Sequence, residues 1–153
     1  MRNIVLITLL TLPCLTWALP AKLSLSGRLE MNHGQVYATQ IELRLKTDTS
    51  KKAVYRGIVK MTTAGKTSSH SAKLILRYSE SRTELNLGGY FDRSYRLRGP
   101  LSNLQAGTEV EMTAVQIYTW ETCYPVGIDD ETCVDHETEE DQGLAHFKFS
   151  PAI

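Results

Sequence analysis

Apolar and polar side chains alternate along much of the chain. Ile41, Leu43 and Leu45 are separated by Glu42 and Arg44, with Lys46 next. This two-residue period is typical of a β-strand with one buried face, and helical spacing does not produce it. The same period predicts strands around Leu23/Leu25, Tyr55/Val59/Met61, Leu74/Leu76/Tyr78, Leu85/Leu87, Phe91/Tyr95/Leu97, Val110/Met112 and Phe147/Phe149.

Short turn sequences separate these runs. They lie at residues 32–34, 48–52, 64–65 and 88–89, and residues 98–107 form a longer corner. The two glycines at 88–89 are expected to form a tight type I′ hairpin, because glycine accepts the positive φ angles of that turn. The turns have the spacing that an antiparallel sheet needs.

About eight strands follow from this pattern. Val115 and Ile117 are out of phase with Val110 and Met112, which predicts a β-bulge near Ala114. The sequence therefore predicts an all-β fold, a single antiparallel β-sandwich or a small β-barrel. An outer-membrane barrel is not expected, because it needs an apolar outer band with aromatic girdles, whereas only 8% of the residues are aromatic.

The N-terminus has the layout of a secretory signal peptide. Arg2 precedes a nearly continuous apolar run at residues 4–15, and Ala18 closes the segment with a small side chain. The alternatives are a buried helix or a membrane anchor, but the run is short for a span and Pro13 would break a helix. We expect residues 1–18 to be removed and residues 19–153 to form one exported domain, periplasmic or secreted.

Two cysteines remain in the expected mature chain, because Cys14 leaves with the signal. In an oxidising compartment, Cys123 and Cys133 should form a disulfide. The alternative is a zinc site that also uses His136 and His146, but the spacing is unlike that of zinc motifs.

Charge is distributed unevenly along the chain. Residues 19–120 carry 15 Lys and Arg against 8 Asp and Glu, whereas residues 121–153 carry one Lys against 9 acids. We interpret residues 121–143 as an acidic loop that the disulfide closes. The loop could be solvated, could recognise a cationic partner, or could bind calcium weakly through Asp129, Asp130, Glu131, Asp135 and Glu137.

The sequence contains no catalytic motif. There is no G-x-S-x-G or S-x-x-K sequence, no H-E-x-x-H spacing and no glycine-rich phosphate loop. The predicted function is therefore a non-catalytic binding protein that holds an envelope or extracellular protein or polymer. The alternative is a hydrolase whose residues meet only in the fold. We expect no cofactor other than calcium.

The basic part of the chain offers two further surfaces. Arg44 and Lys46 share one strand face, as do Arg96 and Arg98. Such faces could hold an anionic polymer or lipid headgroups, or could simply be solvated. Nucleic acid is not expected as a partner, because aromatic side chains are not interleaved with the basic ones.

Overall fold

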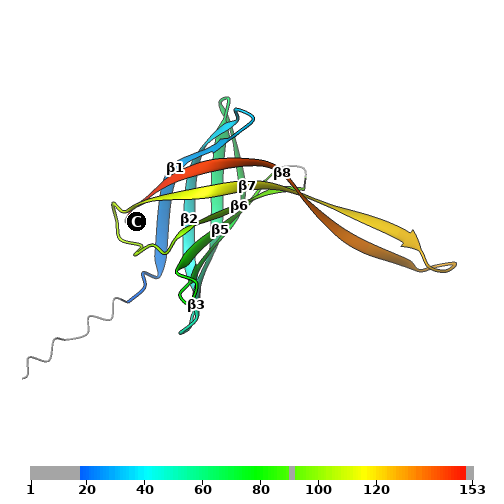
Figure 1. Cartoon of the computed structure of the whole chain (residues 1–153), viewed down its shortest axis with the longest axis horizontal. Helices are drawn as coiled ribbons and strands as arrows, with labels where there is room; N and C mark the ends of the chain where they lie inside the picture. Colours follow the sequence, from blue (N-terminus) through cyan, green and yellow to red (C-terminus); the bar gives the residue numbers. More distant parts are fainter. Residues whose placement is uncertain (1–17, 90–91, 151–153) are drawn as a thin grey trace, which may run out of the picture.

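The computed structural model describes residues 18–89 and 92–150. The strands are β1 (Lys22–Met31), β2 (Val36–Asp48), β3 (Lys52–Thr63), β4 (Lys66–Arg77), β5 (Arg82–Gly88), β6 (Arg93–Pro100), β7 (Glu109–Pro125) and β8 (Glu131–Ser150). All eight are antiparallel in one sheet, and β1 pairs with β8, so the sheet closes into a ring (Figure 1). The predicted all-β fold is confirmed, and it is the barrel rather than the sandwich.

Short turns make each strand pair with the next one in the chain. Ala64 and Gly65 form the tightest connection, with φ angles of 48° and 75°, as a type I′ hairpin requires. The prediction of such a hairpin at Gly88–Gly89 is wrong. Gly88 belongs to β5 and pairs with Ser94, because the strand continues past the pairing of Leu87 with Tyr95.

The apolar residues of the alternating pattern fill the barrel. Leu25, Ile41, Tyr55, Leu85 and Leu97 are each at most 1% exposed. At the end of the barrel opposite the 32–35 turn, the segment before β1 packs Leu19 against the core, and the Tyr55 hydroxyl donates to the Pro20 carbonyl at 2.9 Å. Burial raises the pKa of Tyr55 to about 12.

The strand prediction at Phe91 falls outside the described residues.

The bulge predicted near Ala114 lies later than expected, and its extra residue belongs to β8 rather than β7. Met112, Ala114 and Gln116 all remain buried, and the register against β8 shifts between Gln116 and Ile117. Gln116 pairs with Asp141 and Ile117 with Glu139, so Glu140 is the extra residue, whereas β7 keeps its register against β6 through Tyr118.

The largest difference from the predictions concerns the acidic segment. Residues 121–143 were expected to form a loop, but all of them except 126–130 are strand. Here β7 and β8 continue beyond the barrel as a two-stranded projection, drawn in yellow and brown in Figure 1. We call residues 117–139 the arm. Its acids are compatible with a strand because most of them occupy alternate positions, which places them on one face.

The signal-peptide prediction falls almost entirely on residues 1–17, which lie outside the described residues. Within the described part of the chain, there is no helix with the length and apolar character needed to cross a membrane.

Candidate functional site

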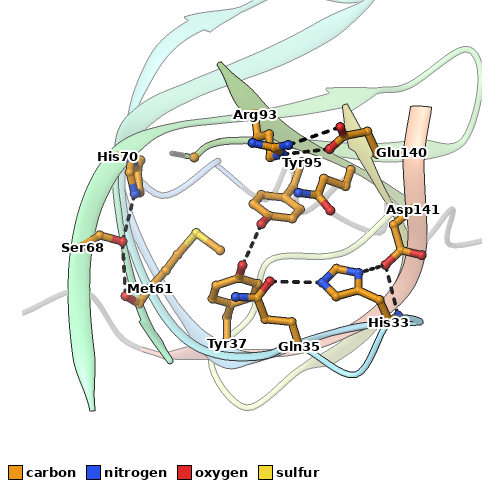
Figure 2. A pocket seen from close by; sticks show the side chains of 12 residues that line it. His33, Gln35, Tyr37, Met61, Ser68, His70, Arg93, Tyr95, Glu140 and Asp141 are labelled. Carbon is orange, nitrogen blue, oxygen red and sulfur yellow. Dashed lines mark hydrogen bonds and ion pairs between the residues drawn. The ribbon is translucent and has the colours of Figure 1, made fainter. Parts of the chain in front are cut away.

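One end of the barrel is open, and we call it the mouth. It contains a cavity of about 550 Å³, within the range of small-molecule sites, between the 32–35 turn and the base of the arm (Figure 2). The residues around it come from six strands and two turns. Each of these strands contributes to the cavity because every second residue of a barrel strand faces inward. The mouth therefore collects polar groups that are far apart in the sequence.

Two tyrosines form the floor of the mouth. The Tyr95 hydroxyl donates to the Tyr37 hydroxyl at 3.0 Å, and the two rings meet edge to face with centroids 5.7 Å apart. Desolvation and this hydrogen bond raise the pKa of Tyr95. Gln116 pairs with Tyr95 across β6 and β7, is only 7% exposed and lines the same cavity.

His33 and Asp141 form an ion pair on one wall. The ring Nδ1 of His33 contacts the Asp141 carboxylate, and its Nε2 lies 3.1 Å from the Gln35 side-chain oxygen (Figure 2). Both partners are acceptors, so they favour the form of the ring that has a proton on each nitrogen. The hydrogen bonds to Gln35 and Asp141 raise the pKa of His33 accordingly. A doubly protonated ring has no free nitrogen to act as a general base.

Ser68 and His70 lie on another wall, two residues apart on β4. His70 Nε2 is 2.9 Å from Ser68 Oγ, and that hydroxyl donates to the Met61 carbonyl at 3.4 Å. The imidazole N–H is therefore the donor to Ser68. A serine nucleophile needs the opposite arrangement, in which its hydroxyl donates to the histidine.

Arg93 connects the mouth to the arm. Its guanidinium donates to Glu140 at 2.8 Å and lies 5.3 Å from the centre of the Tyr118 ring. The hydrogen bond and charge of Glu140 raise the pKa of Arg93. Because Arg93 and Tyr118 are paired across β6 and β7, the inner face of the barrel continues onto the arm.

The inner face of the arm is aromatic and carries no aspartate, glutamate, lysine or arginine. Trp120 stacks on Tyr118 and on His136, with ring centroids 5.5 Å and 5.1 Å apart. Strand alternation and the pairing of β7 with β8 place eight residues on this aromatic face. They are Tyr118, Trp120, Thr122, Tyr124, Thr132, Val134, His136 and Thr138.

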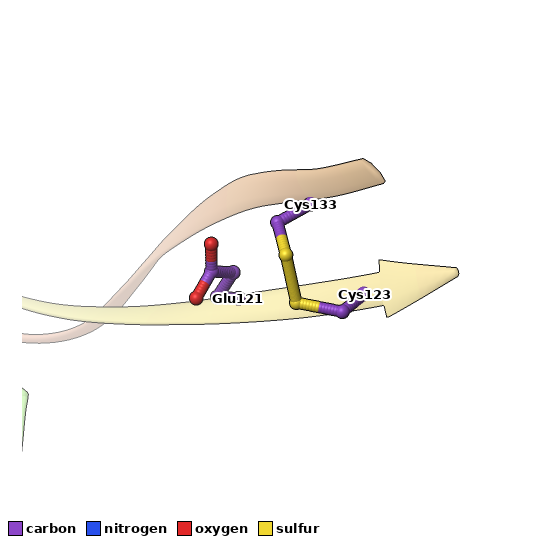
Figure 3. Close-up of side chains that lie close together, drawn as sticks. All are labelled: Glu121, Cys123 and Cys133. Atoms are coloured by element: carbon purple, nitrogen blue, oxygen red, sulfur yellow. A yellow bond between two sulfur atoms is a disulfide. The ribbon is translucent and has the colours of Figure 1, made fainter. Parts of the chain in front are cut away.

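The outer face of the arm is acidic. It carries Glu121, Glu131, Asp135, Glu137 and Glu139, and it continues the outer surface of the barrel, where Arg96 binds Glu137 at 3.3 Å. On this acidic face Cys123 and Cys133 are directly paired, and a disulfide joins them with Cα atoms 4.1 Å apart (Figure 3).

The proposed calcium ligands do not form a compact group. Asp129 and Asp130 lie at the turn of the arm, whereas Glu131, Asp135 and Glu137 follow one another along β8. Among the described residues, the one trio with ligand atoms within 4.8 Å of one another is Glu121 with the two cysteines (Figure 3). The cysteine sulfurs are bonded to each other, so neither is a thiolate ligand. Calcium binding stays a prediction.

Sequence reasoning missed the mouth. His33 lies in the turn predicted at residues 32–34, and nothing in the sequence joins it to Asp141, which lies 108 positions further on. The arm did leave a signal. Glu131, Cys133, Asp135, Glu137 and Glu139 occupy every second position, which is the period of a strand.

Comparison with known protein families finds none that matches this chain, and comparison with curated proteins finds no matching relative.

Proposed function

We propose that this chain is an exported, non-catalytic binding protein that holds a protein partner through its arm. The observation that carries this proposal is the apolar surface that the arm exposes. Tyr124 is 56% exposed, Val126 is 66% exposed and Ile128 is fully exposed. An apolar patch that a folded monomer leaves open to water is typical of an interaction site.

The partner is expected to present a basic rim around an apolar pocket. Tyr124, Val126 and Ile128 at the end of the arm would enter the pocket, as aromatic and aliphatic anchors do at interfaces. The acidic face and the two aspartates at the turn would meet the basic rim. Such charges increase the association rate and favour a partner of opposite charge more than they add affinity.

The arm is built to bind with little loss of conformational freedom. Its strands are paired from Ile117 to Pro125, and the disulfide joins them near the tip. Fixing a binding element before it meets its partner reduces the entropy lost on association. Stacking of Trp120 between Tyr118 and His136 supports the base of the arm in the same way.

The alternative, a hydrolase with its site at the mouth, finds little support in the hydrogen bonds. Neither His33 nor His70 has the arrangement of a base that activates a hydroxyl, for the reasons given above. A hydrolase at the mouth would still depend on these histidines and on Ser68. Loss of a measured hydrolytic activity in Ser68→Ala would therefore favour the hydrolase.

The test is capture of the partner from the compartment to which the protein is exported. Mature protein is cross-linked in envelope extract and captured proteins are identified by mass. The variant Tyr124→Ser/Ile128→Ser should retain at least tenfold less of a basic partner. Leu101→Ser is the matched control, because Leu101 is 39% exposed in the corner between β6 and β7. Equal capture by both variants would refute the arm as the binding element.

Calcium binding by the arm is tested separately. If Asp129 and Asp130 are ligands, calorimetric titration of the mature protein with millimolar calcium should give heat that the Asp129→Asn/Asp130→Asn variant lacks. Absence of heat in both proteins would leave the acids as a solvated or partner-binding surface.

A further inference from the structure

We propose that a groove on the outer surface of the barrel binds a linear acidic polysaccharide. The groove crosses β1 to β4 and is lined by four cations, Lys22, Arg44, Arg56 and Lys73; we call it the basic groove. It lies on the barrel rather than on the arm, and the proposal does not depend on the arm having a partner.

The strand register makes the four cations neighbours. Lys22 is paired with Arg44, Arg44 with Arg56, and Arg56 with Lys73. Paired residues of antiparallel strands share a face, and neighbouring strands lie about 4.8 Å apart. The four positive side chains therefore form a row across four consecutive strands. The first three are exposed and Lys73 is half-buried.

None of these four cations has an acidic partner among residues 18–89 and 92–150. Five other arginines of the described chain are in ion pairs with glutamates: Arg28, Arg77, Arg82, Arg93 and Arg96. Like charges placed directly opposite across strands destabilise a sheet. A row of four cations, none of which is in an ion pair with a described acid, is therefore a cost to folding that an anionic ligand would reduce.

The surface is hollowed along this row. One hollow, of about 470 Å³, is lined by Lys22, Arg44 and Arg56, and a second, of about 490 Å³, by Arg56 and Lys73. They share Arg56 and Gly57, so together they make an elongated depression. An extended ligand fits this shape better than a compact one.

The other side chains of the basic groove favour a polysaccharide among linear anions. Ser24, Ser71, Asn86 and Ser94 line the hollows and can hydrogen-bond to sugar hydroxyls. The lining contains no aromatic ring on which a nucleic-acid base could stack. Glu42 is the one acid in the lining, and three of the cations line the same hollow as Glu42.

The experiment uses mature protein and heparin as the probe. Calorimetric titration should show binding that weakens at least tenfold in Arg44→Gln/Arg56→Gln. Lys51→Gln/Lys66→Gln is the matched control, because it removes the same charge from exposed positions in or beside turns, outside the hollows. The control should bind nearly as the unaltered protein does. The slope of log K against log salt should fall by about two in the groove variant alone, by analogy with phosphate binding.

Several outcomes would overturn the proposal. Equal weakening in both variants would show only a general charge effect. If single-stranded DNA of matched charge binds as tightly as heparin, the groove is not specific for a polysaccharide and the proposal is refuted. If anionic vesicles bind and heparin does not, the ligand is a lipid surface instead. If the groove variant does not fold, heparin protection of Arg44 and Arg56 from arginine modification is measured on the unaltered protein, and absence of protection would refute the site.

Discussion

The protonated form of His33 is favoured by the two acceptors that its ring faces. Hydrogen bonds to Gln35 and Asp141 raise the pKa of His33 above its ordinary value of 6.5. Slight desolvation raises the pKa of Asp141, but the hydrogen bonds from His33 outweigh it and hold that pKa below 3.8. The contribution of the pair to stability is therefore complete between pH 3.8 and 6.5. It is lost as the pH rises through the raised pKa of His33, or falls through the lowered pKa of Asp141.

We expect an NMR titration of the histidine ring protons to give a pKa above 6.5 for His33. In Asp141→Asn the pKa of His33 should move down, because the charge and one strong acceptor are gone. Asp129→Asn removes an acid from the far end of the arm and should leave the pKa of His33 unchanged. A His33 that titrates identically in all three proteins would contradict the ion pair.

Gly57 is required by the close approach of β2 and β3. A Cβ atom at this position would lie 1.8 Å from the Glu42 carbonyl oxygen, so the strands would have to move apart. We expect Gly57→Ala to lower the free energy of unfolding by about 1–3 kcal/mol, as overpacking typically does. The measurement is urea unfolding of both proteins.

Gly127→Ala is the control for this substitution. No atom lies within 4 Å of a Cβ built on Gly127, at the turn of the arm. Its free energy of unfolding should change by less than about 0.5 kcal/mol, as at most surface positions. Equal effects at both glycines would mean that close approach is not the cause.

At the scale of elements, the sequence predicted strands well where alternation was hydrophobic and poorly where it was acidic. Apolar positions such as Ile41 and Leu97 identify the buried face directly, because only one face of each strand meets the core. Beyond Ile117, the described residues of the arm do not contribute to the hydrophobic core. The dense charge between Glu131 and Asp141 was therefore interpreted as a loop, although its alternation had the same two-residue period.

The disulfide is expected to stabilise the arm and not the barrel. Cys123 and Cys133 are ten residues apart, and the ring that they close contains none of the buried apolar core residues. In Cys123→Ser/Cys133→Ser, hydrogen exchange should become faster at arm amides and stay unchanged at barrel amides such as that of Leu97. Faster exchange throughout the barrel would show instead that the arm and barrel unfold together.

At the scale of the whole molecule, the sequence could not decide between a sandwich and a barrel. Alternation defines which face of each strand is buried, and turns define which strands are neighbours. Closure depends on the pairing of β1 with β8, in which Ser24 lies opposite Ser150. No local pattern specifies a contact of such long range. The same pairing brings Asp141 beside His33, which explains why the sequence left closure undecided and gave no indication of the mouth.

Because β8 ends beside the start of β1, the chain can be permuted without breaking the sheet. We expect a circular permutant that joins Ser150 to Leu19 through a flexible linker of about six residues, and opens between Gly127 and Ile128, to fold. The disulfide would hold the two cut strands together near the new termini. Circular dichroism should show a β spectrum with one cooperative thermal transition. The control is a permutant opened between Ile58 and Val59, which interrupts β3 and should not fold. If both permutants fold, or if neither does, a ring of eight continuous strands is contradicted.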